Sequence, residues 1–398
     1  MAANSNNTAF YSFSRLWPIL FLSWIFFMTF VARAVLSPLM PSLEGDLNIS
    51  HTQAGSLFFV MAMGYCGAML GSGFVSGRIT HRYTIMASAV LVGIALLILS
   101  AGRNLWEIRA AVFFLGMAAG LYLPSGITTL TDMVQPKDWG KAVSIHELAP
   151  NLAFVAAPVL AEVLMLWFSW RVVLAVIGIA TIGFGLVFAR FGRGGRFPGQ
   201  PPRPASVRRV MRDRSFWVMV VLFGLAISST MGIYNMLPLY LTSDIGISRP
   251  VANTLMALSR VMGLGTALIS GWATDRFGAR KTIVYAFVMT GTATVCMGAF
   301  TAPEAVVAAV FFQAVLSTIY FPAGFTALSS LFSVDIRNVA IAFTIPLAFM
   351  FGSGVIPAVI GMFGDAGLFA WGFILAGGLM LAGCLLVPLL RNLESGIG

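Results

Sequence analysis

Long apolar runs, each about as long as a membrane is thick, dominate the pattern of hydrophobic and polar positions along the chain. A bilayer core of about 30 Å is crossed by roughly 20 helical residues at 1.5 Å each. Charged residues or Gly/Pro clusters separate the runs. The pattern predicts an all-α, polytopic membrane protein with twelve transmembrane helices, over residues 16–41, 52–74, 83–101, 105–130, 141–164, 171–189, 216–241, 250–271, 282–300, 304–330, 339–361 and 368–390.

The longest connection between these runs divides the chain into two sets of six. Residues 190–214 are rich in Arg, Gly and Pro and are too polar to enter a bilayer. We therefore expect an N-terminal six-helix bundle over residues 1–189, a cytoplasmic linker over 190–214 and a C-terminal six-helix bundle over 215–398.

The composition excludes most other classes of protein. Of the 398 residues, 59% are hydrophobic and 10% are charged, whereas a soluble domain is about 25% charged. A soluble enzyme and a nucleic-acid-binding protein are therefore excluded. The three cysteines, Cys66, Cys296 and Cys384, lie in apolar runs without metal or redox spacing. Because no nucleotide-binding loop or metalloprotease motif occurs either, we expect no cofactor, no metal and no enzymatic activity.

The distribution of Lys and Arg predicts the orientation. With both termini in the cytoplasm, 18 of the 24 basic residues lie on the inner side, eight of them in the linker, and four lie on the outer side. Residues 1–15 are polar and precede an apolar run longer than the core of a signal peptide, so we expect the first helix to be retained. These features predict a multi-pass protein of the cytoplasmic (inner) membrane with both termini cytoplasmic.

The two halves match at a constant offset of 198 residues. Residues 73–78, Gly-Phe-Val-Ser-Gly-Arg, correspond to residues 271–276, Gly-Trp-Ala-Thr-Asp-Arg. The same offset relates Ile49 and Ser50 to Ile247 and Ser248, and Tyr122, Pro124, Gly126 and Thr128 to Tyr320, Pro322, Gly324 and Thr326. A duplicated six-helix unit explains these matches, and such repeats place a substrate site near the midplane at their interface.

The loop between spans 8 and 9 resembles that of a known family. Its sequence over residues 271–281, Gly-Trp-Ala-Thr-Asp-Arg-Phe-Gly-Ala-Arg-Lys, is similar to the loop signature of the major facilitator superfamily. The copy between spans 2 and 3 departs from the signature, with Gly77 in place of aspartate, Thr80 in place of glycine and His81 in place of arginine. The resemblance covers nearly the whole chain and implies two bundles that rock about a central cavity.

The resemblance also implies that these loops latch the outward-facing state. Independently of the family, Asp275 at a helix end can exchange ion-pair partners among nearby basic groups, and glycines permit a tight turn and close helix approach. Ordinary positive-inside charges are the alternative, for Arg82 and Lys281 above all. The expected latch residues are Gly73, Arg78, Arg82, Gly271, Asp275, Arg276, Gly278, Arg280 and Lys281.

Two arginines, Arg33 and Arg260, fall inside the expected spans. A charge at that depth costs about 2.5–3.5 kcal/mol on insertion scales and usually faces a cavity or a partner. Few acids are near, and a guanidinium matches carboxylate or phosphate, so we expect a mobile anion as the partner. Alternatively, Arg33 snorkels to the outer interface or pairs with Glu44 or Asp46.

Both arginines lie in segments similar to those of organic-anion carriers. The run over residues 33–50 resembles the first helix of the anion:cation symporters, in which an arginine helps to bind organic anions, although Ala32 stands where an acid is frequent. Span 4 has no mid-helix arginine, which many of those symporters have. Arg260 instead resembles the span-8 arginine of oxalate and monocarboxylate carriers. The resemblance implies that Arg33 and Arg260 bind substrate.

Glu147 is the only one of the 14 acidic residues expected within a span. It lies about 9 Å along the helix from Lys141 and next to His146. A desolvated carboxyl holds its proton more tightly and an imidazole titrates near neutrality, so we expect Glu147 and His146 to couple transport to protons. The alternatives are a structural hydrogen bond to a neighbouring helix, or pairing of Glu147 with Arg78 or Lys141.

Other polar side chains within the spans can complete an otherwise apolar cavity. Each can orient a substrate by hydrogen bonding, and each can equally bond a neighbouring helix. The expected substrate-binding residues beside the two arginines are Tyr122 on helix 4, Tyr234 and Asn235 on helix 7, and Gln313 and Tyr320 on helix 10.

These observations predict a monomeric secondary active transporter that moves a small organic anion by alternating access, coupled to protons. A proton-driven drug or metabolite efflux antiporter is one alternative. Against it, helix 5 has Ala153 and Ala157 where that group has the glycines of a Gly-x-x-x-Gly-Pro pattern, and two intramembrane arginines suit a lipophilic cation poorly. A siderophore or lysolipid carrier is another alternative. No motif supports a membrane-embedded enzyme or a receptor without transport.

Overall fold

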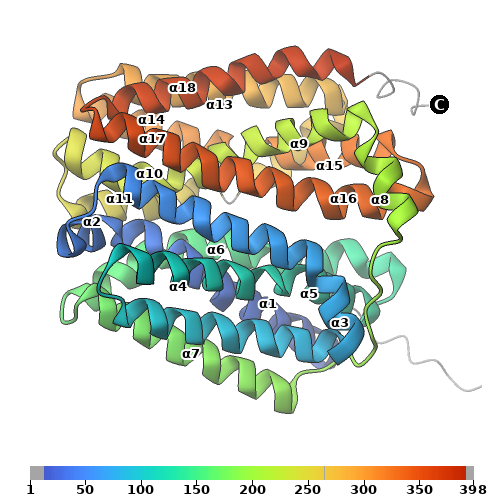
Figure 1. The fold of residues 1–398 in the computed structure, drawn as a ribbon. Helices are drawn as coiled ribbons and strands as arrows, with labels where there is room; N and C mark the ends of the chain where they lie inside the picture. Colours follow the sequence, from blue (N-terminus) through green and yellow to red (C-terminus); the bar gives the residue numbers. More distant parts are fainter. Residues whose placement is uncertain (1–12, 264, 391–398) are drawn as a thin grey trace, which may run out of the picture.

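The computed structural model describes residues 13–263 and 265–390, and every regular element in these ranges is helical (Figure 1). The expected all-α class is confirmed. The N-terminal half contains α1 (Phe13–Ala34), α2 (Leu36–Leu47), α3 (His51–Ala101), α4 (Leu105–Gly120), α5 (Tyr122–Asp132), α6 (Trp139–Met165) and α7 (Trp170–Phe191). The remainder contains α8 (Pro204–Met211), α9 (Arg214–Ile227), α10 (Ile233–Leu239), α11 (Arg249–Gly263), α12 (Thr266–Phe277), α13 (Ala279–Ala299), α14 (Pro303–Leu316), α15 (Tyr320–Leu331), α16 (Val334–Phe349), α17 (Ile356–Asp365) and α18 (Phe369–Gly383).

The helices are consistent with twelve crossings. Ten segments of the described chain are long and apolar enough to span a membrane. One of them, α3, has 51 residues and reverses direction at Thr80, where φ is 71°, so it supplies two crossings. The consecutive helices α11 and α12, which contain Arg260, complete the set.

Several expected spans are interrupted within the membrane. The first breaks at Val35 between α1 and α2, and the fourth breaks at Leu121 between α4 and α5. The seventh contains the π-helical segments η2 (Ser228–Gly232) and η3 (Tyr240–Asp244), and the eleventh contains η4 (Met350–Val355). Breaks and π-helical segments are frequent at functional sites, because they leave backbone groups outside the regular helical ladder.

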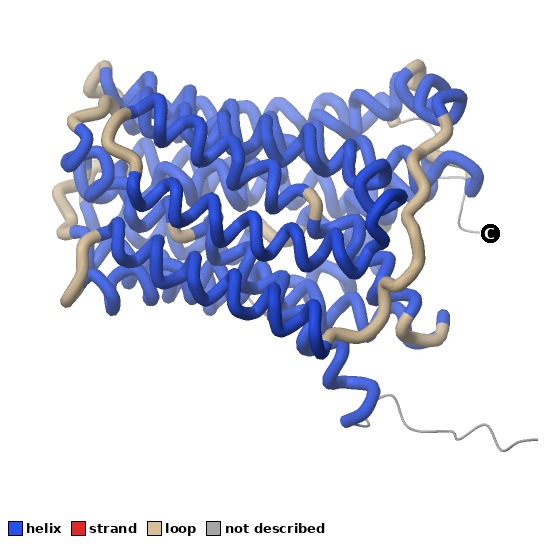
Figure 2. The backbone as a smooth tube through the Cα atoms, turned by 60° about the horizontal axis from the view of Figure 1, so that its bottom comes forward, coloured by secondary structure: helices blue, strands red, loops and turns tan. Residues whose placement is uncertain are grey.

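The crossings form two bundles that lie side by side. Helices α1–α7 make the lower bundle in Figure 1 and α9–α18 make the upper one. The connection between them, residues 192–213, runs along one end of both bundles and is visible as the long loop at the right of Figure 2. We call this the linker end and the opposite end the far end. The sequence pattern does not predict α8, which forms within the linker.

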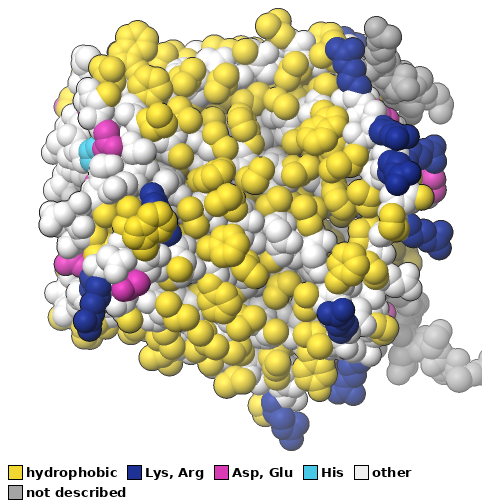
Figure 3. Space-filling model, viewed as in Figure 1, with side chains coloured by type: hydrophobic (Ala, Val, Ile, Leu, Met, Phe, Trp, Pro, Cys, Tyr) yellow, Lys and Arg dark blue, Asp and Glu magenta, His cyan; other side chains and the backbone are white. Residues whose placement is uncertain are grey.

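The surface matches a membrane protein. Hydrophobic side chains cover the middle of the visible face, and Lys and Arg side chains gather at the linker end, at the right of Figure 3. The exposed hydrophobic residues include Trp17, Phe74, Ile179 and Phe312. A broad apolar belt of this kind needs lipid around it, because water disfavours so large an apolar surface.

The two bundles approach each other most closely in the far-end half. Here α3 packs on α17 and η4, α6 packs on α11, and α2 packs on α10. Gly55 lies against the carbonyl of Pro357, and Gly361 lies against the carbonyl of His51, so closely that a Cβ at either glycine would collide. At the linker end, an open hollow of about 480 Å³ is lined by Phe325, Thr326, Ser329, Ser330 and Arg337.

Candidate transport site

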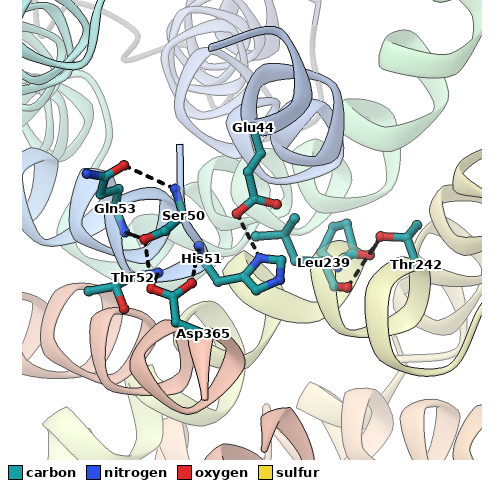
Figure 4. A network of polar contacts seen from close by, with 9 residues as sticks. Glu44, Ser50, His51, Thr52, Gln53, Leu239, Thr242 and Asp365 are labelled. Carbon is teal, nitrogen blue, oxygen red and sulfur yellow. Dashed lines mark hydrogen bonds and ion pairs between the residues drawn. The ribbon is translucent and has the colours of Figure 1, made fainter. Parts of the chain in front are cut away.

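At the far end, a carboxylate of one bundle binds the first turn of a helix in the other (Figure 4). Asp365, the last residue of α17, accepts hydrogen bonds from the Ser50 hydroxyl at 2.7 Å and from the N–H groups of His51 and Thr52 at 2.7 and 3.1 Å. First-turn N–H groups have no partner inside their own helix and carry partial positive charge. Asp365 therefore caps α3 across the boundary between the bundles.

A second carboxylate, in the N-terminal bundle, binds side chains in the first turns of a helix of the C-terminal bundle. Glu162, near the end of α6, accepts hydrogen bonds from Nε of Arg249 at 2.9 Å and from the amide of Asn253 at 2.6 Å. Arg249 begins α11 and stands 198 residues after His51, so the internal repeat relates the two helix starts that these carboxylates bind. We call these two carboxylate contacts the far-end clasps.

Arg33 lies between aromatic rings at the boundary of the bundles. Its guanidinium carbon is 4.6 Å from the ring centroids of both Phe30 and Tyr65, and 5.7 Å from that of Phe349 in the other bundle. The residue is 7% exposed, and its Nε has no hydrogen-bond partner among the described residues. Arg33 therefore neither snorkels nor pairs with Glu44 or Asp46, since Glu44 binds His51 and Asp46 binds Arg171.

Arg260 has the corresponding arrangement in the C-terminal bundle. Its guanidinium carbon is 5.2 Å from the ring of Tyr234 and 5.0 Å from the ring of Phe154, which belongs to the N-terminal bundle. The residue is 9% exposed, and one Nη donates to the carbonyl of Thr230 at 2.7 Å. Each arginine is thus covered by a tyrosine of its own bundle and a phenylalanine of the opposite bundle.

The rings around the two arginines form one layer. Phe30 meets Phe154 with centroids 5.2 Å apart, Tyr65 meets Phe349 at 4.5 Å, and Phe154 meets Tyr234 at 4.7 Å. We call Phe30, Tyr65, Phe154, Tyr234 and Phe349 the aromatic layer. No ion pair joins either arginine to a carboxylate in the part of the chain that the structure describes. Within the described residues, the two positive charges of the layer are therefore stabilised by aromatic rings and carbonyl dipoles and by no negatively charged side chain.

His146 and Glu147 form a pair beside this layer. His146 is fully buried, its ring stacks on Phe26 with centroids 4.5 Å apart, and its Nε2 lies 3.1 Å from the hydroxyl of Tyr122. Nδ1 faces a carboxyl oxygen of Glu147 at 3.4 Å. The Glu147 side chain is 47% exposed and lies within electrostatic reach of Tyr65.

The hydrogen bonds of Tyr122 decide where the protons of this pair lie. Its hydroxyl has one hydrogen, which it donates to the carbonyl of Leu22 at 2.8 Å. The contact with His146 therefore needs a proton on Nε2 of the imidazole. Nδ1 then presents a lone pair to the Glu147 carboxyl, so the 3.4 Å contact is a hydrogen bond only when a proton lies between the two groups.

Asn235 on α10 and Gln313 on α14, both predicted to bind substrate, donate to backbone carbonyls of π-helical segments. Gln313 donates to the carbonyl of Ser229 at 2.7 Å, and Asn235 donates to that of Ser353 at 3.3 Å. A π-helical turn exposes such carbonyls because it departs from the regular ladder. In this conformation both amides therefore bond neighbouring helices, which was the alternative to a role in substrate binding.

Tyr122 and Tyr320, which the repeat relates, are both buried inside their own bundles. Tyr122 stacks on Phe26, and Tyr320 stacks on Phe287 with centroids 5.0 Å apart. The hydroxyl of Tyr320 has no hydrogen-bond partner. Among the predicted tyrosines, it is Tyr234 that contacts an arginine of the aromatic layer.

The two predicted latch loops differ from each other. Asp275 and Arg276 are exposed at the linker end, and no ion pair joins either of them to another residue of the described ranges. Gly278 has φ 80°, the conformation for which glycine is expected in such a turn. Arg82, in contrast, is buried and donates to the carbonyls of Ala189 and Gly192.

Five residues of the site carry no distinctive signal in the sequence pattern. Tyr65, Phe154 and Phe349 are not distinguishable among 33 phenylalanines and eight tyrosines. Glu162 and Asp365 are expected at the outer surface, but without a role. The sequence signal that could have identified Glu162 and Asp365 is their shared position, since each lies near the end of the fifth crossing of its half.

The family follows from comparison with known proteins. The family model described as Major Facilitator Superfamily matches residues 22–248 and again residues 218–396. The chain therefore belongs to the Major Facilitator Superfamily, whose members are membrane transporters and not enzymes.

Individual relatives and structures add detail. Over 253 residues the chain is 26% identical to multidrug resistance protein MdtL of Escherichia fergusonii and of Escherichia coli. The alignment covers 63% of this chain and 64% of each relative, so it spans less than two thirds of their length. A bacterial homologue of the human lysosomal transporter Spinster is similar in structure, with a TM-score of 0.76 at 14% identity over 94% of this chain and 95% of that one. A D-xylose-proton symporter has a TM-score of 0.74 at 17% identity, over 94% and 97%. Identities this low show the fold alone.

Proposed function

We propose that this chain is a secondary active transporter that carries a small organic anion by alternating access. The observation that supports the proposal most is that Arg33 and Arg260 are buried at the bundle boundary without a carboxylate partner in the described chain. A buried charge without a partner is costly, and a carboxylate offers a guanidinium both charge and paired hydrogen bonds. Because aromatic rings cover the guanidinium faces, the anion binds at their N–H edges.

The linker end is the cytoplasmic end in this proposal. The linker contributes eight of the 24 basic residues, more than any other connection, and such residues remain on the cytoplasmic side of a membrane. The far-end clasps then close the outer side, and the conformation is inward-facing. Both termini are cytoplasmic, the membrane is the bacterial inner membrane, and one chain supplies both bundles, so the protein acts as a monomer.

Proton coupling is assigned to Glu147 and His146. The pair lies next to the aromatic layer through Phe26 and Phe30, whose rings are 5.9 Å apart. A proton on the pair removes the negative charge that would otherwise repel an incoming anion. Proton and anion therefore bind together, which is the requirement for symport.

Thermal unfolding of the purified protein tests the anion site. Acetate, benzoate, oxalate, phosphate and methanesulfonate are added one at a time, since a ligand at 100 times its Kd stabilises the folded state by about 2.7 kcal/mol. We expect at least one carboxylate to raise the Tm of the wild type and neither Arg33→Ala nor Arg260→Ala to respond. Arg103→Ala is the matched control, because Arg103 is exposed at the far end. No stabilisation by any anion, or equal stabilisation of both variants, would refute the proposal.

A drug efflux antiporter is the second candidate function. The identity with MdtL and the aromatic layer favour it, since aromatic rings also bind lipophilic cations. The same assay with tetraphenylphosphonium distinguishes the two. Stabilisation by this cation that survives both arginine substitutions, together with no response to anions, would favour the antiporter.

A further inference from the structure

The turn between the two crossings of α3 holds part of the linker. Thr80, with φ 71° and ψ 161°, interrupts the helix and leaves carbonyl groups before it and N–H groups after it without helical partners. The linker supplies these partners by running beside the turn. The N–H of His81 donates to the carbonyl of Phe197 at 3.2 Å, that of Arg82 donates to Gly195 at 2.7 Å, and that of Gly199 donates to Ser76 at 3.1 Å.

Side chains of the turn hold the same segment. Arg82 is 7% exposed and donates to the carbonyl of Ala189 at 2.9 Å and to that of Gly192, which fixes the start of the linker. The ring of His81 packs on Phe197 with centroids 5.0 Å apart. Arg82 is thus engaged within its own half of the molecule.

Contact with the linker explains why this loop departs from the family signature. A Cβ at Gly77 would lie 3.1 Å from the carbonyl oxygen of Gly199, and one at Gly73 would lie 3.2 Å from that of Gln200. The aspartate of the signature at position 77 would therefore push the linker away. Gly195 has φ 67°, and a Cβ there would lie 2.9 Å from the backbone nitrogen of Arg82, so the linker also needs glycine at this position.

The second copy of the turn has the same backbone, but no segment of residues 13–263 or 265–390 occupies it in this way. Gly278 stands 198 residues after Thr80 and has φ 80° and ψ 156°. No atom of the described residues lies within 4 Å of a Cβ built on Gly271 or Gly278. Asp275, which corresponds to Gly77, is exposed. This turn remains open to a partner from the other bundle.

The other part of the linker is attached to the C-terminal bundle. Helix α8 packs on α16, and Arg209 pairs with Asp335 at 3.0 Å. Between the two attached parts lie residues 200–204, Gln-Pro-Pro-Arg-Pro. A segment of this composition is extended and stiff, because each proline fixes its own φ and restricts the residue before it.

We infer that residues 192–200 stay docked on the N-terminal bundle throughout the transport cycle, so that the 73–82 turn is a dock for the linker and only the 271–281 loop latches the cytoplasmic side. The stiff segment over residues 200–204 then connects the docked part of the linker to the C-terminal bundle while the bundles move relative to each other. The inference rests on the alternating access proposed above. It reassigns Gly73, Arg78 and Arg82, which the family resemblance places in a latch.

A disulfide across the dock tests this inference. A Cβ at Gly199 lies 2.9 Å from the Cβ of Ser76, somewhat under the roughly 3.5–4.5 Å of a disulfide, so a small shift allows Ser76→Cys and Gly199→Cys to pair. The three native cysteines are replaced by alanine. The matched control, Ala62→Cys with Gly354→Cys, joins the two bundles in the far-end half, where the corresponding Cβ atoms lie 3.0 Å apart.

Amide hydrogen exchange of His51 and Thr52 is the readout, because their N–H groups are released only when the far end opens. For the protein with the dock disulfide, we expect the exchange rates in the oxidised and reduced forms to agree within twofold. For the protein with the control disulfide, we expect oxidation to slow exchange at least tenfold. If the dock disulfide slows exchange as much as the control disulfide does, the inference is overturned, because the linker would then have to leave the 73–82 turn when the far end opens. If the control disulfide changes nothing, the far end does not open at all, and the proposed alternating access fails instead. Each oxidised protein is compared with its own reduced form, so folding differences between variants do not affect the result.

Discussion

Arg33 and Arg260 each lie in the last turn of a helix, Arg33 in α1 and Arg260 in α11. The partial negative charge at a helix C-terminus stabilises a cation by about 0.3–1 kcal/mol, and each desolvated aromatic face adds about 0.5–2 kcal/mol. Together these offset most of the about 2.5–3.5 kcal/mol that a charge costs at this depth. The arginines are thus tolerable without substrate, while N–H groups at their edges stay available for an anion.

Glu147→Gln should remove the pH dependence of anion binding. In the wild type, carboxylate binding is expected to be strong while the Glu147–His146 pair holds its proton and to weaken about tenfold as rising pH removes it. A tenfold change corresponds to about 1.4 kcal/mol. The glutamine has no charge to repel the anion, so binding should stay constant between pH 5.5 and 8.

Benzoate-dependent shifts in Tm across that pH range measure the effect. Asp138→Asn is the control, since Asp138 pairs with Lys141 near the start of the same helix and lies away from His146. A Glu147→Gln protein with the wild-type pH profile would show that protons are bound elsewhere.

At this scale the sequence predicts charged residues better than their surroundings. Arg33, Arg260 and Glu147 stand out because ionisable groups are rare in apolar runs. The aromatic layer is not predictable, because phenylalanine is common on lipid-facing and buried positions alike. Likewise, the bond from Tyr122 that sets the proton position of His146 joins residues 24 positions apart, and no local pattern encodes it.

At the scale of elements, both far-end clasps hold the start of a helix from the opposite bundle, Asp365 as a cap on backbone N–H groups and Glu162 through the side chains of Arg249 and Asn253. Loss of a cap typically costs about 1 kcal/mol. Asp365→Asn and Glu162→Gln should each weaken closure by about that amount and should speed exchange of the His51 and Thr52 amides severalfold. The double variant should have the larger effect.

Asp46→Asn is the matched control for the clasps. Asp46 is also a far-end carboxylate in an ion pair, but its partner Arg171 lies in the same bundle. Exchange at His51 and Thr52 should therefore remain at the wild-type rate. Equal acceleration in this control would mean that the surface charge, and not contact between bundles, controls opening.

Gly55→Ala should destabilise the same closed end sterically. The added methyl group would collide with the carbonyl of Pro357, and overpacking of this kind costs about 1–3 kcal/mol. We expect a lower Tm and faster exchange at the start of α3. Gly45→Ala, with no atom within 4 Å of the new Cβ, should have neither effect. A Gly55→Ala protein as stable as the wild type would show that the bundles separate there at little cost.

The elements themselves are mostly predictable and their interruptions are not. Apolar length alone locates the crossings, because the bilayer imposes the same thickness on each helix. The breaks at Val35 and Leu121 and the π-helical segments depend on partners in other helices, such as Gly232, which lies against the carbonyl of Gly352. The linker helix α8 also escapes prediction, because its stability comes from packing on α16.

At the scale of the whole molecule, the two halves share a fold but divide their tasks. The repeat supplies corresponding helix starts for the clasps at the far end and equivalent turns at the linker end, yet within the described residues the linker occupies one of these turns and leaves the other open to the other bundle. Asp275→Asn should therefore shift the population toward the inward-facing state, because it removes the charge available to a latch of the outward-facing state.

Exchange at His51 and Thr52 reports that shift and should slow severalfold in Asp275→Asn. Arg78→Ala, at the exposed position that corresponds to Arg276, should leave exchange unchanged. If both substitutions slow exchange equally, both loops act as latches.

The stiff segment over residues 200–204 is also the only covalent path from one bundle to the other. It acts as a tether, which keeps the effective concentration of each bundle near its partner high. A protease site inserted there would divide the chain into two complete six-helix polypeptides. The far-end clasps and the aromatic layer would then be the main contacts that hold them together, so the dissociation of the cut halves would measure how strongly the closed outer side binds.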